Sequence, residues 1–117
     1  MPGVYLHIPF CKQACHYCNF HFSTSLRQKG ATVDAIVRAL ERQKDSLQGA
    51  PLSSIYFGGG TPSLLDAGEL ERIFAKIYQL HIVQTEAEIT LEANPDDLDL
   101  LKLQVLRNTP VNRLSIG

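Results

Sequence analysis

The sequence predicts an α/β fold built from parallel β/α units, because strand patterns and helix patterns alternate along the whole chain. Strand patterns occur at residues 4–8, 54–57, 88–92 and 111–116, and a helical stripe separates each from the next. Most of the distinctive short motifs follow the ends of these strands, where parallel β/α folds gather their reactive groups. A chain of 117 residues can bury a core and is most simply one domain.

The first expected strand, residues 4–8, alternates between two faces and is ended by a proline. Its apolar face, which should pack on helices, consists of Val4, Leu6 and Ile8. The opposite face carries Tyr5 and His7, which should therefore point away from the helices.

Apolar stripes with helical spacing predict three connecting helices. The first stripe consists of Val33, Ile36, Val37, Leu40 and Leu47, and the second of Leu70, Ile73, Phe74 and Ile77. Asp66, with Glu69 three residues later, forms a capping pair for the second helix. Acidic residues just after Pro95 favour the start of a third helix there. That start would lie at Asp96 and Asp97, and the helix would carry Leu98, Leu101 and Val105.

The later strands give the sheet one apolar and one polar face. Residues 54–57 form a short buried strand that runs into three glycines, Gly58 to Gly60. In the last two strands the helix-facing side should carry Ile89, Leu91, Leu114 and Ile116, and the other side Thr90, Glu92, Arg113 and Ser115. A barrel without an interior ligand more often fills its interior with aliphatic side chains. A half-solvated sheet face is the alternative explanation, but the motifs fall on this same polar face, which favours a ligand-lined interior.

The chain has three cysteines, at positions 11, 15 and 18, and they lie within eight residues of one another. An odd number of thiols cannot all pair as disulfides. Three thiolates are also one ligand short of a closed zinc site or of a fully protein-ligated cubane cluster. An iron–sulfur site with one open metal position, a zinc site completed by a histidine, and a chance group of buried thiols all fit the spacing. Histidines available to such a zinc site are His7, His16 and His21.

The run from His7 to Phe20, HIPFCKQACHYCNF, resembles the cluster loop of radical S-adenosylmethionine enzymes. It is most similar to the group that contains the oxygen-independent coproporphyrinogen III oxidases and the heme chaperone HemW. Further motifs match this group in the expected order: Tyr5, the GGGTP run at 58–62, the EANP run at 92–95 and the RLSIG run at 113–117. The resemblance covers essentially the whole chain, and this ordered set is far more specific than a lone glycine run.

The resemblance implies a partial, open TIM-like barrel, of which these β/α units would form the first part. Residues 1–117 are accordingly expected to be the N-terminal portion of a radical S-adenosylmethionine core domain. The rest of the barrel and a C-terminal region would lie outside this sequence, and the isolated portion would be inactive.

The resemblance also implies the cofactors and their contacts. Cys11, Cys15 and Cys18 would each ligate one iron of a 4Fe-4S cluster, and S-adenosyl-L-methionine would chelate the fourth iron. An electron from the cluster would then cleave the sulfonium to give methionine and a 5′-deoxyadenosyl radical. Expected cofactor-binding residues are Tyr5, Tyr17 beside the adenine, Gly59, Gly60 and Thr61 near the methionine moiety, and Glu92 at the ribose. Arg113 would face an acidic substrate or the cofactor carboxylate, and no catalytic residue is assigned.

Phe20 separates the branches of this group, because the oxidase branch carries an additional cysteine at that position. The chain also begins almost at the first strand, which favours the heme-chaperone branch. The expected partners are then heme, heme-acceptor proteins and an electron donor. The alternatives are an oxygen-independent coproporphyrinogen III oxidase acting on a porphyrinogen, and a zinc-binding structural module.

Composition gives limits on partners and location. The net charge is −1 and 44% of residues are hydrophobic, so no basic surplus points to nucleic acid. No apolar run approaches the roughly 20 residues of a membrane-spanning helix. Clustered thiols together with a start that lacks signal-peptide features indicate a cytoplasmic protein.

Overall fold

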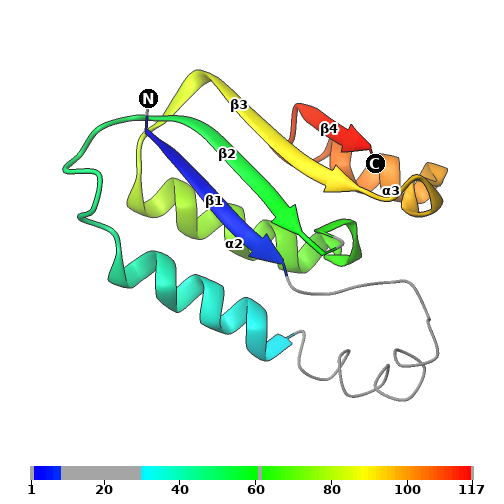
Figure 1. Ribbon diagram of the computed structural model, residues 1–117, viewed down its shortest axis with the longest axis horizontal. Helices are drawn as coiled ribbons and strands as arrows, with labels where there is room; N and C mark the ends of the chain where they lie inside the picture. The colour runs from blue at the N-terminus through cyan, green and yellow to red at the C-terminus, as the bar shows by residue number, and fades with distance from the viewer. Residues whose placement is uncertain (1, 9–29, 61, 117) are drawn as a thin grey trace.

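The computed structural model of the chain describes residues 2–8, 30–60 and 62–116, and its centre is a parallel β-sheet (Figure 1). The strands are β1 (Gly3–Ile8), β2 (Leu52–Gly59), β3 (Val83–Ala93) and β4 (Arg113–Ile116). They lie in the order β1-β2-β3-β4, and each neighbouring pair is parallel. The prediction of parallel β/α units is therefore confirmed.

Helices connect successive strands in the described part of the chain. Residues 30–42 are helical, α2 spans Ala67–Leu80 and α3 spans Leu100–Arg107. Two short 3-10 helices, η1 (Pro62–Leu64) and η2 (Pro95–Asp97), follow β2 and β3. Because the strands lie side by side in chain order and such crossovers are right-handed, the helices gather on one face of the sheet. This leaves the other face open for a site.

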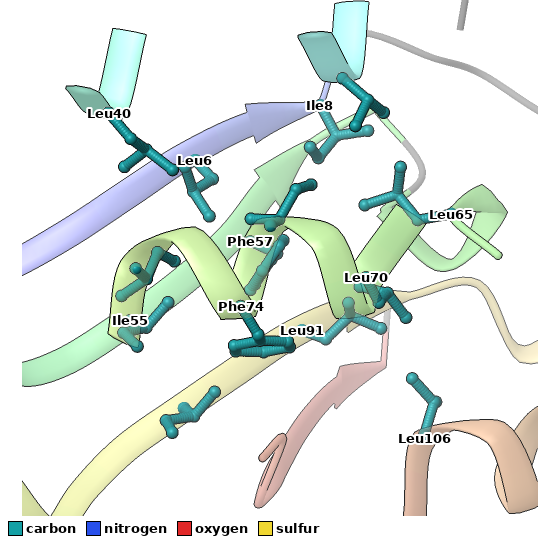
Figure 2. Packing of buried hydrophobic residues seen from close by; sticks show 14 of the residues in the cluster. Leu6, Ile8, Leu40, Ile55, Phe57, Leu65, Leu70, Phe74, Leu91 and Leu106 are labelled. Carbon is teal, nitrogen blue, oxygen red and sulfur yellow. The ribbon is translucent and has the colours of Figure 1, made fainter. Parts of the chain in front are cut away.

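The core lies between the sheet and these helices (Figure 2). Phe57 of β2 is fully buried and its ring lies 5.2 Å from that of Phe74 on α2. Buried residues from β1, β2, β3 and the helices join one cluster, which includes Leu6, Ile8, Leu40, Ile55, Ile89, Leu91 and Leu106. The helix-facing residues expected in the first and third strands are thus buried, apart from the half-buried Val4. Ile116, expected on the same side, is 57% exposed, because β4 is the edge strand and has a neighbour on one side only.

The second helix agrees with its sequence signals. Asp66 accepts a hydrogen bond from the backbone N–H of Glu69, and the Glu69 side chain accepts one from the backbone of Asp66. This reciprocal pair satisfies N–H groups that the first turn of a helix leaves unpaired. The predicted stripe of Leu70, Ile73, Phe74 and Ile77 is buried.

The expected start of the third helix is wrong. The cap of α3 is Asp99, whose carboxylate accepts from the backbone N–H of Lys102. Asp96 and Asp97 belong instead to η2, where the Asn94 side chain accepts from the Asp96 backbone. The side chain of α3 that packs in the core is Leu106, whereas Leu101, expected on the apolar stripe, is 73% exposed.

The extents of other elements also differ from the sequence patterns. The first helix ends at residue 42, before Leu47, which still packs half-buried against the core. β3 begins at Val83, five residues earlier than expected, because Val83 also pairs with Leu52 of β2, and a register shift separates this pair from the regular ladder that starts at Ser54 and Glu88. β4 is shorter than its pattern and begins at Arg113.

Candidate functional site

The open face of the sheet carries a row of polar and aromatic side chains. Backbone register places Tyr5 beside Tyr56, Tyr56 beside Thr90, and Thr90 beside Arg113. Tyr5 is 58% exposed while its neighbours Leu6 and Ile8 are buried on the helix side. The predicted division of β1 into two faces is therefore confirmed.

Glu92 lies on this face, near the carboxyl end of β3. Its Oε2 accepts a hydrogen bond from the Tyr56 hydroxyl at 2.6 Å, and its Oε1 accepts one from the Gly59 backbone N–H at 3.1 Å. Both donors belong to β2, so the carboxylate bridges two adjacent strands. An ionised carboxylate offers about four lone-pair positions, so Glu92 retains capacity to accept further hydrogen bonds from a ligand.

Tyr56 is a site residue that the sequence reasoning missed. Its ring stacks on Tyr5 with centroids 5.8 Å apart and planes 16° apart. The hydrogen bond to Glu92 is the main cause that raises the pKa of Tyr56 above its ordinary value. Burial adds to this rise, and a hydrogen bond with Ser115 opposes it. The alternation of side chains along residues 54–57 is the sequence signal that could have identified Tyr56. It lies between Ile55 and Phe57, which are buried on the helix side of the sheet, so its own side chain points to the open face.

The glycine loop at the end of β2 packs closely against β1. A side chain at Gly58 would place its Cβ 2.8 Å from the Tyr5 hydroxyl, and one at Gly59 would lie 2.8 Å from the His7 ring. Gly59 also has a φ of +104°, a conformation that favours glycine. These two glycines therefore allow the end of β2 to pack closely against the side chains of β1.

The backbone donors of the loop have partners within the chain. Gly59 donates to Glu92, and Gly60 donates to the Ile8 carbonyl at 2.7 Å. The expectation that Gly59 and Gly60 lie near the methionine moiety of the cofactor stays a prediction. A ligand that used either donor would have to replace one of these bonds.

Arg113 lies on the open face but is directed away from Glu92. It forms an ion pair with Glu88, which precedes Glu92 on the same side of β3. The two side chains are 61% and 57% exposed, and exposed pairs of this kind typically contribute about 0–1 kcal/mol. The ion pair is therefore easily broken, and a role for Arg113 toward a substrate or cofactor carboxylate stays a prediction.

The predicted metal ligands Cys11, Cys15 and Cys18, and the predicted cofactor contacts Tyr17 and Thr61, lie outside the described residues. Within residues 2–8, 30–60 and 62–116, no group of three or more His, Cys, Asp or Glu side chains could hold a metal ion. The cysteine site therefore stays a prediction from the sequence. His7, a candidate zinc ligand, lies 3.5 Å from the Tyr5 hydroxyl through its Nδ1.

Comparison with known sequence families decides the membership of the chain. The Radical SAM superfamily matches residues 5–117. The chain belongs to the Radical SAM superfamily. Its relatives match it over nearly its full length: the heme chaperone HemW of Synechocystis sp. is 39% identical over 98% of this chain, and HemW of Lactococcus lactis is 40% identical over 98%. Anaerobilin synthase of Escherichia coli O157:H7 is 38% identical over 97%.

These relatives are longer than the chain. It spans 29% and 30% of the two HemW proteins and 26% of anaerobilin synthase. Among solved structures, the coproporphyrinogen III oxidase HemN from Escherichia coli, described as a radical SAM enzyme, matches with a TM-score of 0.78 at 28% identity. The match covers 99% of this chain and 27% of HemN, which agrees with an α/β arrangement of the Radical SAM type.

None of the helices in the described part of the chain combines the length and apolarity needed to cross a membrane.

Replacement of Gly59 by alanine should destabilise the chain and disrupt the site. The new Cβ would meet the His7 ring and the Ile8 carbonyl in a backbone conformation that side chains rarely adopt. Strained backbone of this kind costs about 1–3 kcal/mol, which urea unfolding would measure. The matched control is Gly68→Ala on α2, where the nearest contact is an ordinary 3.6 Å and alanine should be neutral or stabilising. Equal stability of the two variants would contradict the assigned role of Gly59.

Proposed function

We propose that the chain is the N-terminal part of a radical S-adenosylmethionine core domain that binds a 4Fe-4S cluster and S-adenosyl-L-methionine. Membership in the Radical SAM superfamily over residues 5–117 is the observation that carries the proposal. Cys11, Cys15 and Cys18 would hold the cluster through their thiolates. Tyr17 and Thr61 are proposed as further contacts to the S-adenosyl-L-methionine.

The described residues fit such a cofactor. Glu92 presents a carboxylate with spare acceptor capacity at the carboxyl end of β3, where parallel β/α folds bind ligands. Ribose hydroxyls are donors that suit this acceptor. The exposed ring of Tyr5, backed by Tyr56, offers a flat apolar surface beside it. Glycine at position 58 leaves room for this ring, because a Cβ there would lie 2.8 Å from the Tyr5 hydroxyl.

When bound, the cluster and S-adenosyl-L-methionine supply one-electron reductive cleavage of a sulfonium carbon–sulfur bond. The described residues bind and orient. Glu92 accepts hydrogen bonds from the ribose, and Tyr56 fixes the direction of the carboxylate by donating to Oε2. Tyr5 covers one side of the ligand and limits the access of water.

The longer protein that contains this chain is proposed to be a heme chaperone. The support is the set of HemW relatives that match at 39% and 40% identity, together with Phe20 in place of the additional cysteine of the oxidase branch. Heme, heme-acceptor proteins and an electron donor are its proposed partners. Clustered thiols persist in a reducing compartment, so the cytoplasm is the proposed location.

A coproporphyrinogen III oxidase is the second candidate, favoured by the structural likeness to HemN at a TM-score of 0.78. The reaction would be an oxidative decarboxylation in porphyrin biosynthesis with a porphyrinogen as substrate. Stable heme binding by the complete protein, without anaerobic turnover of coproporphyrinogen III, supports the chaperone. Turnover without stable heme binding supports the oxidase.

The experiment that tests cofactor binding is low-temperature electron paramagnetic resonance of anaerobically reconstituted, dithionite-reduced protein. A reduced 4Fe-4S signal that shifts on addition of S-adenosyl-L-methionine is expected, because the cofactor would occupy the open iron. A cluster signal indifferent to the cofactor would contradict the proposed binding site. Stoichiometric zinc in place of a cluster would support the structural zinc module instead.

A further inference from the structure

A buried hydrogen bond joins the two loops that carry the candidate site. The Ser63 hydroxyl donates to Oδ2 of Asp97 at 2.8 Å, and the two residues are 2% and 9% exposed. Ser63 lies in η1, directly after the glycine loop of β2. Asp97 lies in η2, directly after β3 and its Glu92. The pair therefore connects segments 34 residues apart in sequence but adjacent at the carboxyl ends of two strands.

We propose that Ser63 and Asp97 are positioning residues that hold the glycine loop and Glu92 in the relative placement needed to bind S-adenosyl-L-methionine. This inference rests on the proposed function and adds to it residues that contact neither the cofactor nor the cluster. Neither residue lies on the row of side chains that follows Tyr5, Tyr56 and Glu92 across the open face of the sheet.

The other hydrogen bonds that join these two segments lie at the proposed ligand site. The buried pair is the link that lies away from it. Glu92 is bonded to Tyr56 and to the Gly59 N–H, and both bonds lie at the carboxylate that a ligand would use. A ligand that bonds Glu92 uses the remaining lone pairs of the same carboxylate and so loads these two links directly. The Ser63–Asp97 bond lies in the protein interior, away from this carboxylate, so it holds the two segments independently of what Glu92 binds.

A polar pair suits this role better than an apolar contact. A hydroxyl-to-carboxylate bond is directional, and a buried bond of this kind sets a distance and an angle between its partners. Apolar packing of the same volume tolerates small sliding of one loop over the other. A second polar link acts in the same region, because Lys102 of α3 donates to the Leu65 carbonyl at 3.1 Å, just after η1.

The test measures the dissociation constant of S-adenosyl-L-methionine by equilibrium dialysis against reconstituted protein, together with urea unfolding. Ser63→Ala should weaken binding about tenfold, the consequence of losing one charge-assisted hydrogen bond that sets geometry. Ser63→Thr keeps the hydroxyl and should restore most of the affinity. The matched control is Ser53→Ala at the opposite end of β2, whose hydroxyl donates to the Pro2 carbonyl at 2.9 Å. This variant also loses a serine hydroxyl hydrogen bond, here to a backbone carbonyl, and should leave the affinity unchanged.

A readout without the cofactor separates positioning from general stability. The raised pKa of Tyr56 depends mainly on its bond to Glu92, so displacement of the loop in Ser63→Ala should lower that pKa toward its ordinary value. Ultraviolet titration of tyrosinate, with Tyr56→Phe as reference, measures the shift. Ser53→Ala should leave it unaltered.

The outcomes of the dialysis distinguish this inference from the proposed function. Absence of S-adenosyl-L-methionine binding by the unmodified protein overturns the proposed function. Binding by the unmodified protein with the same affinity in Ser63→Ala overturns the positioning role alone. Equal losses of affinity in Ser63→Ala and Ser53→Ala also overturn it, because the effect would then be one of stability. If Ser63→Ala fails to fold, Asp97→Asn replaces it: this variant keeps an acceptor but no charge, and unchanged affinity and Tyr56 titration in it would overturn the role of the charged bond.

Discussion

Replacement of Cys15 by alanine is expected to abolish assembly of the 4Fe-4S cluster. The chain has three cysteines and no others, so the variant would retain two thiolates for a cluster that the proposal anchors through three. A cubane held by the protein at two irons exposes two open positions and is readily lost. Iron and acid-labile sulfide, measured after anaerobic reconstitution, should fall from about four of each per chain to background.

His16→Ala is the matched control, because His16 directly follows Cys15 in the sequence and is a candidate ligand in the alternative zinc site. Under the cluster proposal it should keep its full content of iron and sulfide. Full iron and sulfide in Cys15→Ala would remove the ligand assignment. Bound zinc in the unmodified protein that is lost in both variants would instead support the structural zinc module.

The two faces of the sheet could be predicted because alternation along a strand is a local property. Leu6 and Tyr5 point in opposite directions whatever their neighbours, so the sequence placed Tyr5 and Glu92 on the open face before any partner was known. Tyr56 obeys the same rule but was missed, because its strand was interpreted only as a buried apolar run. Its bond to Glu92 depends on the register between β2 and β3, which no local pattern determines.

The loops after the strands could not be predicted to the residue. The segment after β3 offers Asp96, Asp97 and Asp99, and any of them is an acceptable residue at the start of a helix. The Asn94 side chain accepts a hydrogen bond from the Asp96 backbone and forms a short turn. The Asp97 carboxylate accepts a buried hydrogen bond from the Ser63 hydroxyl. Only Asp99 then remains to cap α3. Which aspartate caps α3 therefore depends on a hydrogen bond between residues 34 positions apart in sequence, and a local sequence pattern does not contain that information.

Glu92→Gln is expected to weaken S-adenosyl-L-methionine binding by about tenfold to a hundredfold, the consequence of replacing a charged hydrogen-bond acceptor by a neutral one. The substitution keeps the shape of the side chain and leaves an oxygen for Tyr56, so the loops should remain in place. Tyr56→Phe is the matched comparison, because it removes the donor to Oε2 but keeps the carboxylate. Its loss of affinity should be smaller. Equilibrium dialysis of the unmodified protein and both variants gives the three dissociation constants.

The same substitution should change the response of stability to alkaline pH. Because the bond to Glu92 raises the pKa of Tyr56 in the folded protein, the folded state keeps its phenol proton at pH values where the unfolded state has lost it. The resulting stabilisation is fully present below the ordinary pKa of about 10 and is lost as pH rises through the higher folded value. Glu92→Gln lowers the folded pKa toward the ordinary one, so the decline in urea stability above about pH 10 should become shallower. Tyr56→Phe should remove this contribution altogether.

The S-adenosyl-L-methionine affinity and the alkaline titration of Tyr56, measured together, separate a structural role of Glu92 from a ligand-binding role. A carboxylate that only anchors Tyr56 would, when replaced, flatten the alkaline decline and leave S-adenosyl-L-methionine binding intact. If the carboxylate also binds the ribose, its replacement must both flatten the alkaline decline and weaken S-adenosyl-L-methionine binding, because the charge that holds the Tyr56 hydroxyl is the charge offered to the ligand. Unchanged affinity with an altered Tyr56 titration would therefore reduce Glu92 to an internal link between β2 and β3. Loss of both the affinity and the raised pKa of Tyr56 would support a carboxylate that binds the ligand and the Tyr56 hydroxyl at the same time.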